Sequence, residues 1–169
     1  MPAPVYATGD VPSATEVNNW FVNVTYARKT ATESVTNSIT LQGDDHLTVT
    51  VDANTAYEMT CVIRYDGDTT GDIQTGWTLP SGTSWDYIAV GQHTSAVNYA
   101  DDQTAAFGAT DTPAFGAIGA GTTCAAMVHG LLVVGGTGGG VQLRWAQRAS
   151  SATPTRVFAG SYLLLRRVS

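Results

Sequence analysis

From residue 34 to the C-terminus, apolar and polar residues tend to alternate with a period of two. The longest such run places five apolar side chains on one face, namely Tyr57, Met59, Cys61, Ile63 and Tyr65. Polar residues fall between them, among them Glu58, Thr60 and Arg64. A period of two is typical of a β-strand that buries one face and exposes the other. This part of the chain is therefore predicted to form β-strands.

Turn-forming residues divide the region into a series of predicted strands. We expect a hairpin in which residues 35–41 and 47–51 flank a Gly43-Asp44-Asp45 turn. Further strands are expected at 57–65, 73–79, 85–90, 123–134, 141–145 and 161–168. Residues 91–122 are less regular and predict a long loop, with one short strand near 105–107, which is a candidate contact surface. Eight or more strands without intervening helices predict an all-β fold, an antiparallel β-sandwich or jelly roll, with a closed barrel as the alternative.

The N-terminal residues follow a different pattern. Ser13 and Glu16 have the spacing of a capping box, and Val17, Trp20, Phe21 and Val24 then recur at helical spacing. A short helix is predicted over residues 14–28, with Arg28 and Lys29 at its C-terminal end, where the helix dipole favours cations. Prolines before it indicate an extended arm. The predicted division is an arm with one short helix at 1–33 and a β-sandwich domain at 34–169.

Charge is sparse and unevenly distributed along the chain. Charged residues make up 13% of the 169 residues and the net charge is −6. Eleven acidic residues but only one basic residue, Arg64, occur from Asp44 to Asp111, whereas the basic residues Arg144, Arg148, Arg156, Arg166 and Arg167 follow. The acidic strands are therefore expected to find cationic partners later in the chain or in a neighbouring copy. The acidic balance argues against nucleic acid as a partner, and neither a transmembrane helix nor a signal peptide is expected.

The residue types that carry catalysis are present but do not form recognisable motifs. His46, His93 and His129 are placed on a turn, a loop and a buried strand, without metal-ligand spacing. The cysteines, Cys61 and Cys124, are expected to be buried free thiols, with a disulfide between them as the alternative. The acids of the Asp66–Asp72 loop, together with Asp44, Asp45, Asp101 and Asp102, are interpreted as solvent-exposed turn residues rather than calcium ligands. We therefore predict no catalytic, cofactor-binding or metal-binding residues, and no enzymatic activity.

Apolar residues in excess of the core suggest contacts between subunits. The segment Tyr162–Arg167 is apolar on both faces, which implies cover on both sides. Trp20 and Phe21 on a short helix must either fold back onto the sandwich or dock on another subunit. The predicted assembly contacts are Val17, Trp20, Phe21, Val24, Tyr162, Leu164, Arg166 and Arg167.

Several segments also resemble virion proteins of tailed bacteriophages. Ala7–Trp20 resembles the opening of many such proteins, in which a glycine-containing turn leads into a short asparagine-containing helix. The first strands of a group from phages of actinobacteria are similar to Ile39–Val51, Asn54–Tyr57 and Ile63–Tyr65. The closing strands of that group are similar to Val141–Gln147, Ser150–Thr153 and Ala159–Arg167. Together these segments cover about two thirds of the chain.

The resemblance implies a virion surface protein that is assembled in the host cytoplasm and carries no catalytic residues. Its leading form is a capsid decoration protein, a minor capsid protein that binds the major capsid protein from outside as a homotrimer and stabilises the lattice. A head-fibre-like protein belongs to the same expectation. The alternative is a minor tail or fibre-tip protein that contacts the host surface, with glycan binding by aromatic residues such as Trp77, Trp85 or Tyr99. A hydrolase of cell-wall polymers is a third hypothesis.

Overall fold

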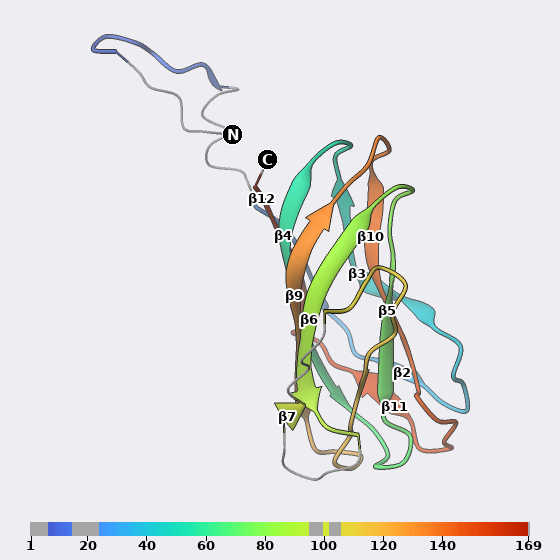
Figure 1. The fold of residues 1–169 in the computed structure, drawn as a ribbon. Helices are drawn as coiled ribbons and strands as arrows, with labels where there is room; N and C mark the ends of the chain where they lie inside the picture. Colours follow the sequence, from blue (N-terminus) through green and yellow to red (C-terminus); the bar gives the residue numbers. More distant parts are fainter. Residues whose placement is uncertain (1–6, 15–23, 95–99, 102–105, 169) are drawn as a thin grey trace.

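The protein is an antiparallel β-sandwich, which confirms the predicted fold class (Figure 1). The computed structural model describes residues 7–14, 24–94, 100–101 and 106–168. Its strands are β1 (Val24–Arg28), β2 (Glu33–Val35), β3 (Gln42–Val51), β4 (Ala56–Asp66), β5 (Ile73–Thr78), β6 (Ser84–Gln92), β7 (Ala100–Asp101), β8 (Ala114–Phe115), β9 (Cys124–Val133), β10 (Gly139–Ala146), β11 (Thr155–Val157) and β12 (Tyr162–Arg167). Within the described residues, no helix is long and apolar enough to cross a membrane.

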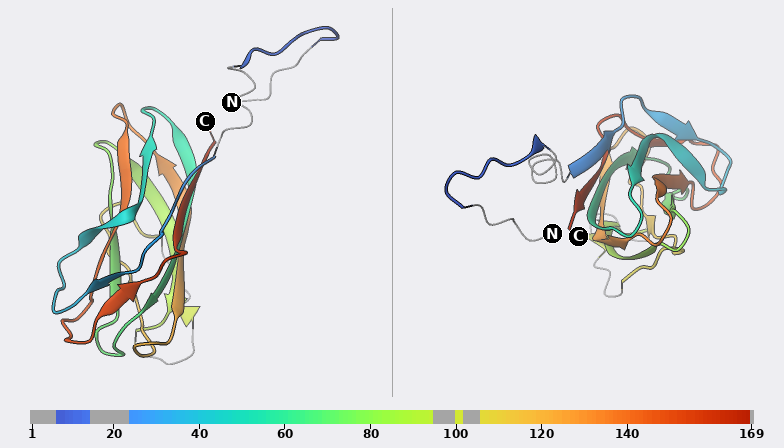
Figure 2. Two further views of the ribbon diagram at one scale, coloured as in Figure 1. Left: turned by 180° about the vertical axis from the view of Figure 1, so that it is seen from behind. Right: turned by 90° about the horizontal axis from the view of Figure 1, so that it is seen from above.

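Two sheets form the layers of the sandwich. The larger one, here called sheet A, has the strand order β1-β12-β4-β9-β6-β7, and β11 bridges its strand β4 to β2. The smaller one, sheet B, has the order β3-β10-β5-β8. Figure 2 shows the two layers face to face, with the N-terminal and C-terminal strands β1 and β12 side by side at one margin of sheet A. Because sequence neighbours often belong to different sheets, most of the contacts that hold the fold are distant in sequence.

The core lies between the sheets and is built by alternate residues of each strand. In β4 every second side chain from Tyr57 to Tyr65 is buried, as the period of two predicted. Sheet B contributes Leu143 and Trp145 from β10, both fully buried. Trp77, Trp85, Tyr87 and Phe107 form a continuous aromatic cluster, in which Trp77 meets Trp85 edge to face and the other neighbouring rings are stacked. Burial of this apolar area is the main stabilising contribution to the fold.

The structure corrects the predicted helix in its last five residues. Val24–Arg28 is strand β1, which pairs along its whole length with β12, from Val24 opposite Arg166 to Arg28 opposite Tyr162. The backbone of β12 needs a hydrogen-bonded neighbour on this side, and β1 supplies it, so that tertiary pairing overrides the helical spacing. Sheet A thus already begins at Val24. The rest of the predicted helix, residues 15–23, lies outside the described residues, as does most of the predicted contact segment at 95–99 and 102–105.

Three other predictions of local structure differ from the structure. The expected Gly43-Asp44-Asp45 turn lies inside β3, and the first predicted strand, 35–41, shares only Val35 with β2. The predicted hairpin is wrong, because β2 pairs with β11 and β3 pairs with β10. The long loop after β6 contains two short strands, β7 and β8, and near the predicted strand at 105–107 Phe107 forms an isolated bridge with Tyr87. Strand β11 was not predicted at all. It has only three residues, too few for a period to be visible.

Candidate functional site

The outer face of sheet A is an apolar surface that the described residues leave uncovered. Strand pairing aligns its residues into rows that cross the sheet from β1 to β6. One row is Tyr26, Leu164, Thr60, His129 and Ile88, and the next is Arg28, Tyr162, Val62, Met127 and Val90. A third row is Val24, Arg166, Glu58, Leu131 and Asp86. Cross-strand neighbours in each row point to the same side of the sheet.

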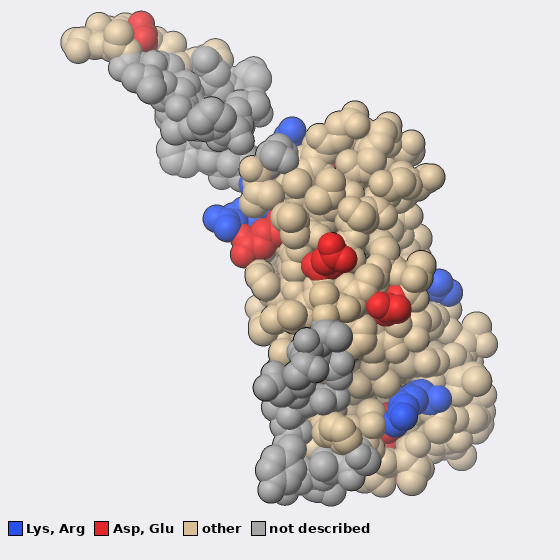
Figure 3. All heavy atoms as spheres, in the orientation of Figure 1, with Lys and Arg blue, Asp and Glu red and all other residues tan. Residues whose placement is uncertain are grey.

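The exposed apolar residues concentrate on this face. Of the ten exposed large hydrophobic residues among those described, only Val11 and Ile39 lie elsewhere. The other eight are Val24, Tyr26, Ile88, Met127, Leu131, Val133, Tyr162 and Val168. Tyr26 is 70% exposed and Leu131 is 50% exposed. Figure 3 shows few charged atoms over β4, β9 and β6. Contiguous apolar surface of this kind is characteristic of interaction sites.

Four of the predicted assembly residues lie on this face. Val24 and Tyr162 are exposed. Leu164 is half-buried on β12, between the neighbouring strands β1 and β4. Arg166 forms an ion pair with Glu58. Arg167 lies on the opposite side of β12 at its end and forms an ion pair with Asp52. Val17, Trp20 and Phe21 fall outside the described residues. Sequence reasoning missed Tyr26, Ile88, Met127 and Leu131, whose period-two positions did not reveal which face would remain uncovered.

His129 lies on this face, although its strand was expected to be buried. Its side chain is 41% exposed, and its Nδ1 atom lies 2.9 Å from Oγ1 of Thr60 on β4. Its Nε2 atom lies 3.7 Å from a carboxylate oxygen of Glu58. The histidine is thus part of a polar patch within an otherwise apolar surface.

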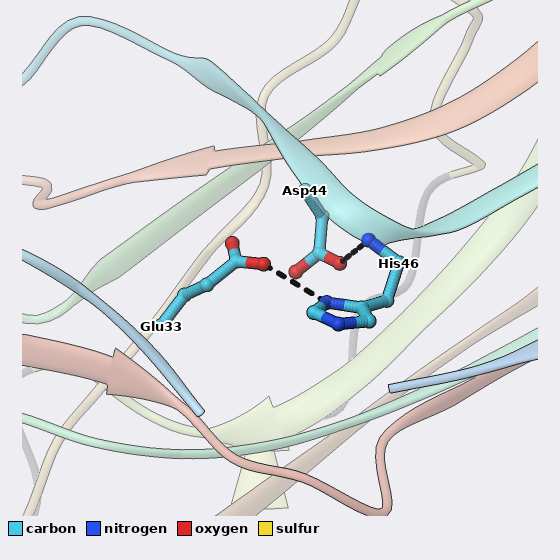
Figure 4. A group of neighbouring side chains, drawn as sticks. All are labelled: Glu33, Asp44 and His46. Carbon is cyan, nitrogen blue, oxygen red and sulfur yellow. Dashed lines mark hydrogen bonds and ion pairs between the residues drawn. The ribbon is translucent and has the colours of Figure 1, made fainter. Parts of the chain in front are cut away.

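A second candidate site is a buried cluster around Lys29 at the margin where β1 meets β3. Lys29 is fully buried, and its Nζ atom lies 2.7 Å from Oδ2 of Asp44, also fully buried. The same Nζ atom lies 2.7 Å from Oε1 of Glu33. Oε1 also accepts a hydrogen bond from the backbone N–H of Asp45 at 3.2 Å and lies 3.1 Å from Nδ1 of His46. Figure 4 shows Glu33, Asp44 and His46 converging on one point.

An irregularity in β3 turns Asp44 toward the interior. Opposite β10, Gly43 pairs with Arg144 and Thr48 with Gln142, so four residues of β3 face the single residue Leu143. This bulge directs two consecutive backbone N–H groups, those of His46 and Leu47, at Oδ1 of Asp44, each at 2.9 Å. The indole N–H of Trp145 donates to Oδ2 at 3.2 Å. Bulges commonly re-aim side chains in this way near functional sites.

The cation held by this cluster is the lysine ammonium. Glu33, Asp44 and His46 together have the donor atoms of a small metal site, all within 4.8 Å of one another. The Lys29 ammonium, however, is already placed between the two carboxylates. Sequence reasoning missed this cluster for two reasons. Lys29 was interpreted as the end of a helix and Asp44 as an exposed turn residue, and both interpretations are wrong.

The acidic loop after β4 is tied to basic residues of the C-terminal half. Asp66 and Asp72 are buried, so their prediction as solvent-exposed residues is wrong, whereas Asp68 is half-buried. Asp66 forms an ion pair with Arg156, Asp72 with Arg148, and Asp68 accepts a hydrogen bond from Ser151 at 2.7 Å. Burial raises the pKa of Asp66, but hydrogen bonds from Arg156 and the Gly121 N–H outweigh it and hold the pKa below its ordinary value. At Asp72 burial prevails and raises the pKa. The predicted pairing of acidic and later basic segments is thereby confirmed within the chain.

Cysteines and tryptophans belong to the interior. Cys61 and Cys124 are buried free thiols, as predicted, and burial raises the pKa of both. Trp77 and Trp85 are buried in the aromatic cluster and therefore cannot form a surface for glycans. Tyr99, Asp101 and Asp102 have side chains outside the described residues.

Comparison with known proteins does not identify the chain. No family model matches the sequence, and no curated protein matches it. Among solved structures, a chain in the structure of infectious bursal disease virus Gt strain is similar, with a TM-score of 0.20 and 10% sequence identity. The match covers 86% of this chain and 40% of that chain, so this chain spans less than half of the other's length. A likeness of this degree carries no argument about function.

Proposed function

We propose that this protein is a non-enzymatic structural component of a phage virion that acts by assembly through the outer face of sheet A. In the form that we favour, it is a capsid decoration protein that forms a homotrimer on the outside of the head. The observation that carries this proposal is the uncovered apolar face, with eight exposed large hydrophobic residues. The virion context is supplied by the sequence resemblance described above.

The size of the face suits a stable contact between subunits. Five strands about 4.8 Å apart and roughly 30 Å long give a face of roughly 700 Å². A standard protein interface buries about 800 Å² per partner. A second copy of the chain is the occupant that we propose, because the apolar residues are spread over the whole face and leave its two margins with opposite charges.

The charges at the margins favour a head-to-tail contact. Arg28 on β1 lies at one margin, and Asp86 on β6 lies toward the other. Neither has an ion-pair partner within the described part of the chain. A contact that repeats around a ring places the basic margin of one subunit against the acidic margin of the next, as a cyclic trimer requires. A contact between identical margins would instead oppose like charges, which is unfavourable.

The oligomeric state of the purified protein tests the assembly step. Light scattering at micromolar concentration should give the mass of a trimer. Leu131→Asp combined with Ile88→Asp should give a monomer with unchanged β-sheet content by circular dichroism, because a buried, unpaired carboxylate opposes association. Ile39→Asp is the matched control, since Ile39 is 56% exposed but lies away from the face. A monomeric wild-type protein, or a trimer that tolerates the double substitution, would contradict the proposal.

The position of the protein on the phage particle distinguishes a capsid decoration protein from a tail protein. Gold labelling of a tagged protein in intact virions should place it over the head surface. Labelling at the tail tip would replace the capsid role with the minor tail or fibre-tip role and leave assembly through sheet A intact.

A further inference from the structure

The buried cluster brings together an amine, a carboxyl group and a second carboxylate, the groups that amide condensation requires. We propose that Lys29 and Asp44 condense spontaneously into an intramolecular amide, with Glu33 as the catalytic proton carrier. This covalent bond would join the end of β1 in sheet A to β3 in sheet B. The proposal is independent of the assembly face and of the virion role.

The reacting groups are held in contact by the backbone on both sides. Nζ of Lys29 lies 2.7 Å from Oδ2 of Asp44. The backbone N–H of Lys29 donates a hydrogen bond to the carbonyl of Ser161 at 2.8 Å, and the backbone carbonyl of Lys29 accepts one from the N–H of Gly160 at 2.8 Å. The bulge in β3 fixes Asp44 through two further backbone hydrogen bonds. Reactants oriented in this way react as if at very high concentration, which removes most of the entropic barrier.

The polar groups around Asp44 match the charge that develops during attack on its carboxyl carbon. As the Nζ–Cγ bond forms, negative charge accumulates on Oδ1, which the N–H groups of His46 and Leu47 already contact at 2.9 Å. Two backbone donors at this distance constitute an oxyanion hole. Oδ2, which contacts both the Lys29 ammonium and the indole N–H of Trp145, is the oxygen that departs.

Glu33 is placed to move both protons that the reaction must transfer. Its Oε1 atom lies 2.7 Å from Nζ of Lys29. It takes one proton from the ammonium and delivers it to Oδ2, after which the free amine attacks Cγ. It then carries a second proton from the nitrogen to the same oxygen, the Cγ–Oδ2 bond breaks, and one water molecule leaves. The carboxylate of Glu33 is regenerated, and no oxidant, reductant or cofactor is consumed.

The environment favours the product over the ion pair. Two opposite charges in a fully buried site carry a large desolvation penalty, and condensation replaces them with one neutral amide. The amide oxygen keeps the two backbone donors of His46 and Leu47, and the amide N–H can donate to Glu33. One hydrogen bond is lost, that of the Trp145 indole N–H, whose acceptor Oδ2 leaves as water.

The intact mass of the folded protein is the direct test. After purification and denaturation, the chain should weigh less than its sequence predicts by one water molecule. Peptide mapping should find a branched fragment in which Lys29 is bonded to Asp44. Succinimide formation at Asp66-Gly67 would also release water, but a succinimide is cleaved by hydroxylamine and gives no branched fragment.

Two variants test the mechanism separately from folding. Glu33→Gln removes the proton carrier and should fold with the full sequence mass. Lys29→Arg keeps a cation beside Asp44 but should not condense, so this variant should also have the full mass of its own sequence, without loss of water. Both should show the same β-sheet content as the wild type and a lower midpoint of thermal unfolding. A folded wild-type protein that retains the full mass would overturn the proposal in favour of a permanent ion pair. Water loss that persists in Glu33→Gln would overturn the role of Glu33 as proton carrier.

Discussion

The two faces of sheet A are both largely apolar, but only one of them is covered within the chain. On β9, Leu132 points inward and is fully buried, whereas its neighbour Leu131 points outward and is 50% exposed. The inner face is filled by sheet B, while the described residues place no second layer over the outer face from β1 to β6. The difference shows that an apolar residue in a strand predicts burial only where the topology provides a covering layer. Its contribution to stability or to assembly depends on that layer.

The largest effect on the free energy of unfolding is expected when a charged residue inside the sandwich is removed. Lys29→Ala removes the partner of Asp44, whether the two are joined by the proposed amide or by an ion pair. It leaves a buried carboxylate without a cation, which costs about 3–5 kcal/mol. We expect a decrease of this size in the free energy of unfolding, measured by urea denaturation with intrinsic fluorescence. A decrease below about 1 kcal/mol, as is typical of exposed pairs, would show that the cluster is open to water.

Two adjacent leucines of β9 test the comparison on one strand. Leu132→Ala should lower the free energy of unfolding by about 2–5 kcal/mol, because it leaves a cavity in a filled core. Leu131→Ala should change it by no more than about 0.5 kcal/mol in the dissociated protein. Chemical denaturation at concentrations below the association range measures both. Equal effects would mean that the outer face is covered within a single chain.

By strand alternation Asp66 of β4 belongs to the outer face of sheet A, but neighbouring segments of the chain cover it. Its carboxylate is buried by contacts with Arg156 and Gly121, and its pKa is lowered overall. A lowered pKa in the folded state gives stability that is present above the unfolded pKa of about 4 and is lost as pH falls through the folded value. Asp66→Asn should therefore destabilise the protein by about 1–3 kcal/mol at pH 7. Thermal unfolding scans from pH 7 to pH 2 should show the difference between the two proteins shrinking below about pH 4; a constant difference would contradict the prediction.

The smallest effect is expected for the ion pair on the uncovered face. Arg166 donates a hydrogen bond from Nε to Glu58 at 2.7 Å, in contact with solvent. Arg166→Ala should lower the free energy of unfolding by at most about 1 kcal/mol, because exposed pairs are screened by water. The free energy of unfolding of this variant should be the same at high and at low salt, measured in the dissociated protein. A larger decrease in the free energy of unfolding would show that this ion pair is buried.

The sequence alone determined the fold class and most of the strands. In β4, β9 and β10 the strand backbone alternates its side chains regardless of the neighbouring strand, so a period of two is visible before any contact is known. The pairing of acidic segments with later arginines was also predicted, because charge segregation along a chain requires compensation across the fold.

The tertiary structure decided which face is covered and where Lys29 and Asp44 lie. Val24 fits both a helical stripe and a strand, and only the pairing of β1 with β12 resolves this. Gly43-Asp44-Asp45 has the composition of a turn, yet a bulge opposite β10 turns Asp44 inward to meet Lys29. Both outcomes depend on contacts between residues far apart in sequence, whose free energies exceed the local preferences of a few residues. A local pattern can show that two faces of a strand differ, but only the packing of the sheets determines which groups meet across them.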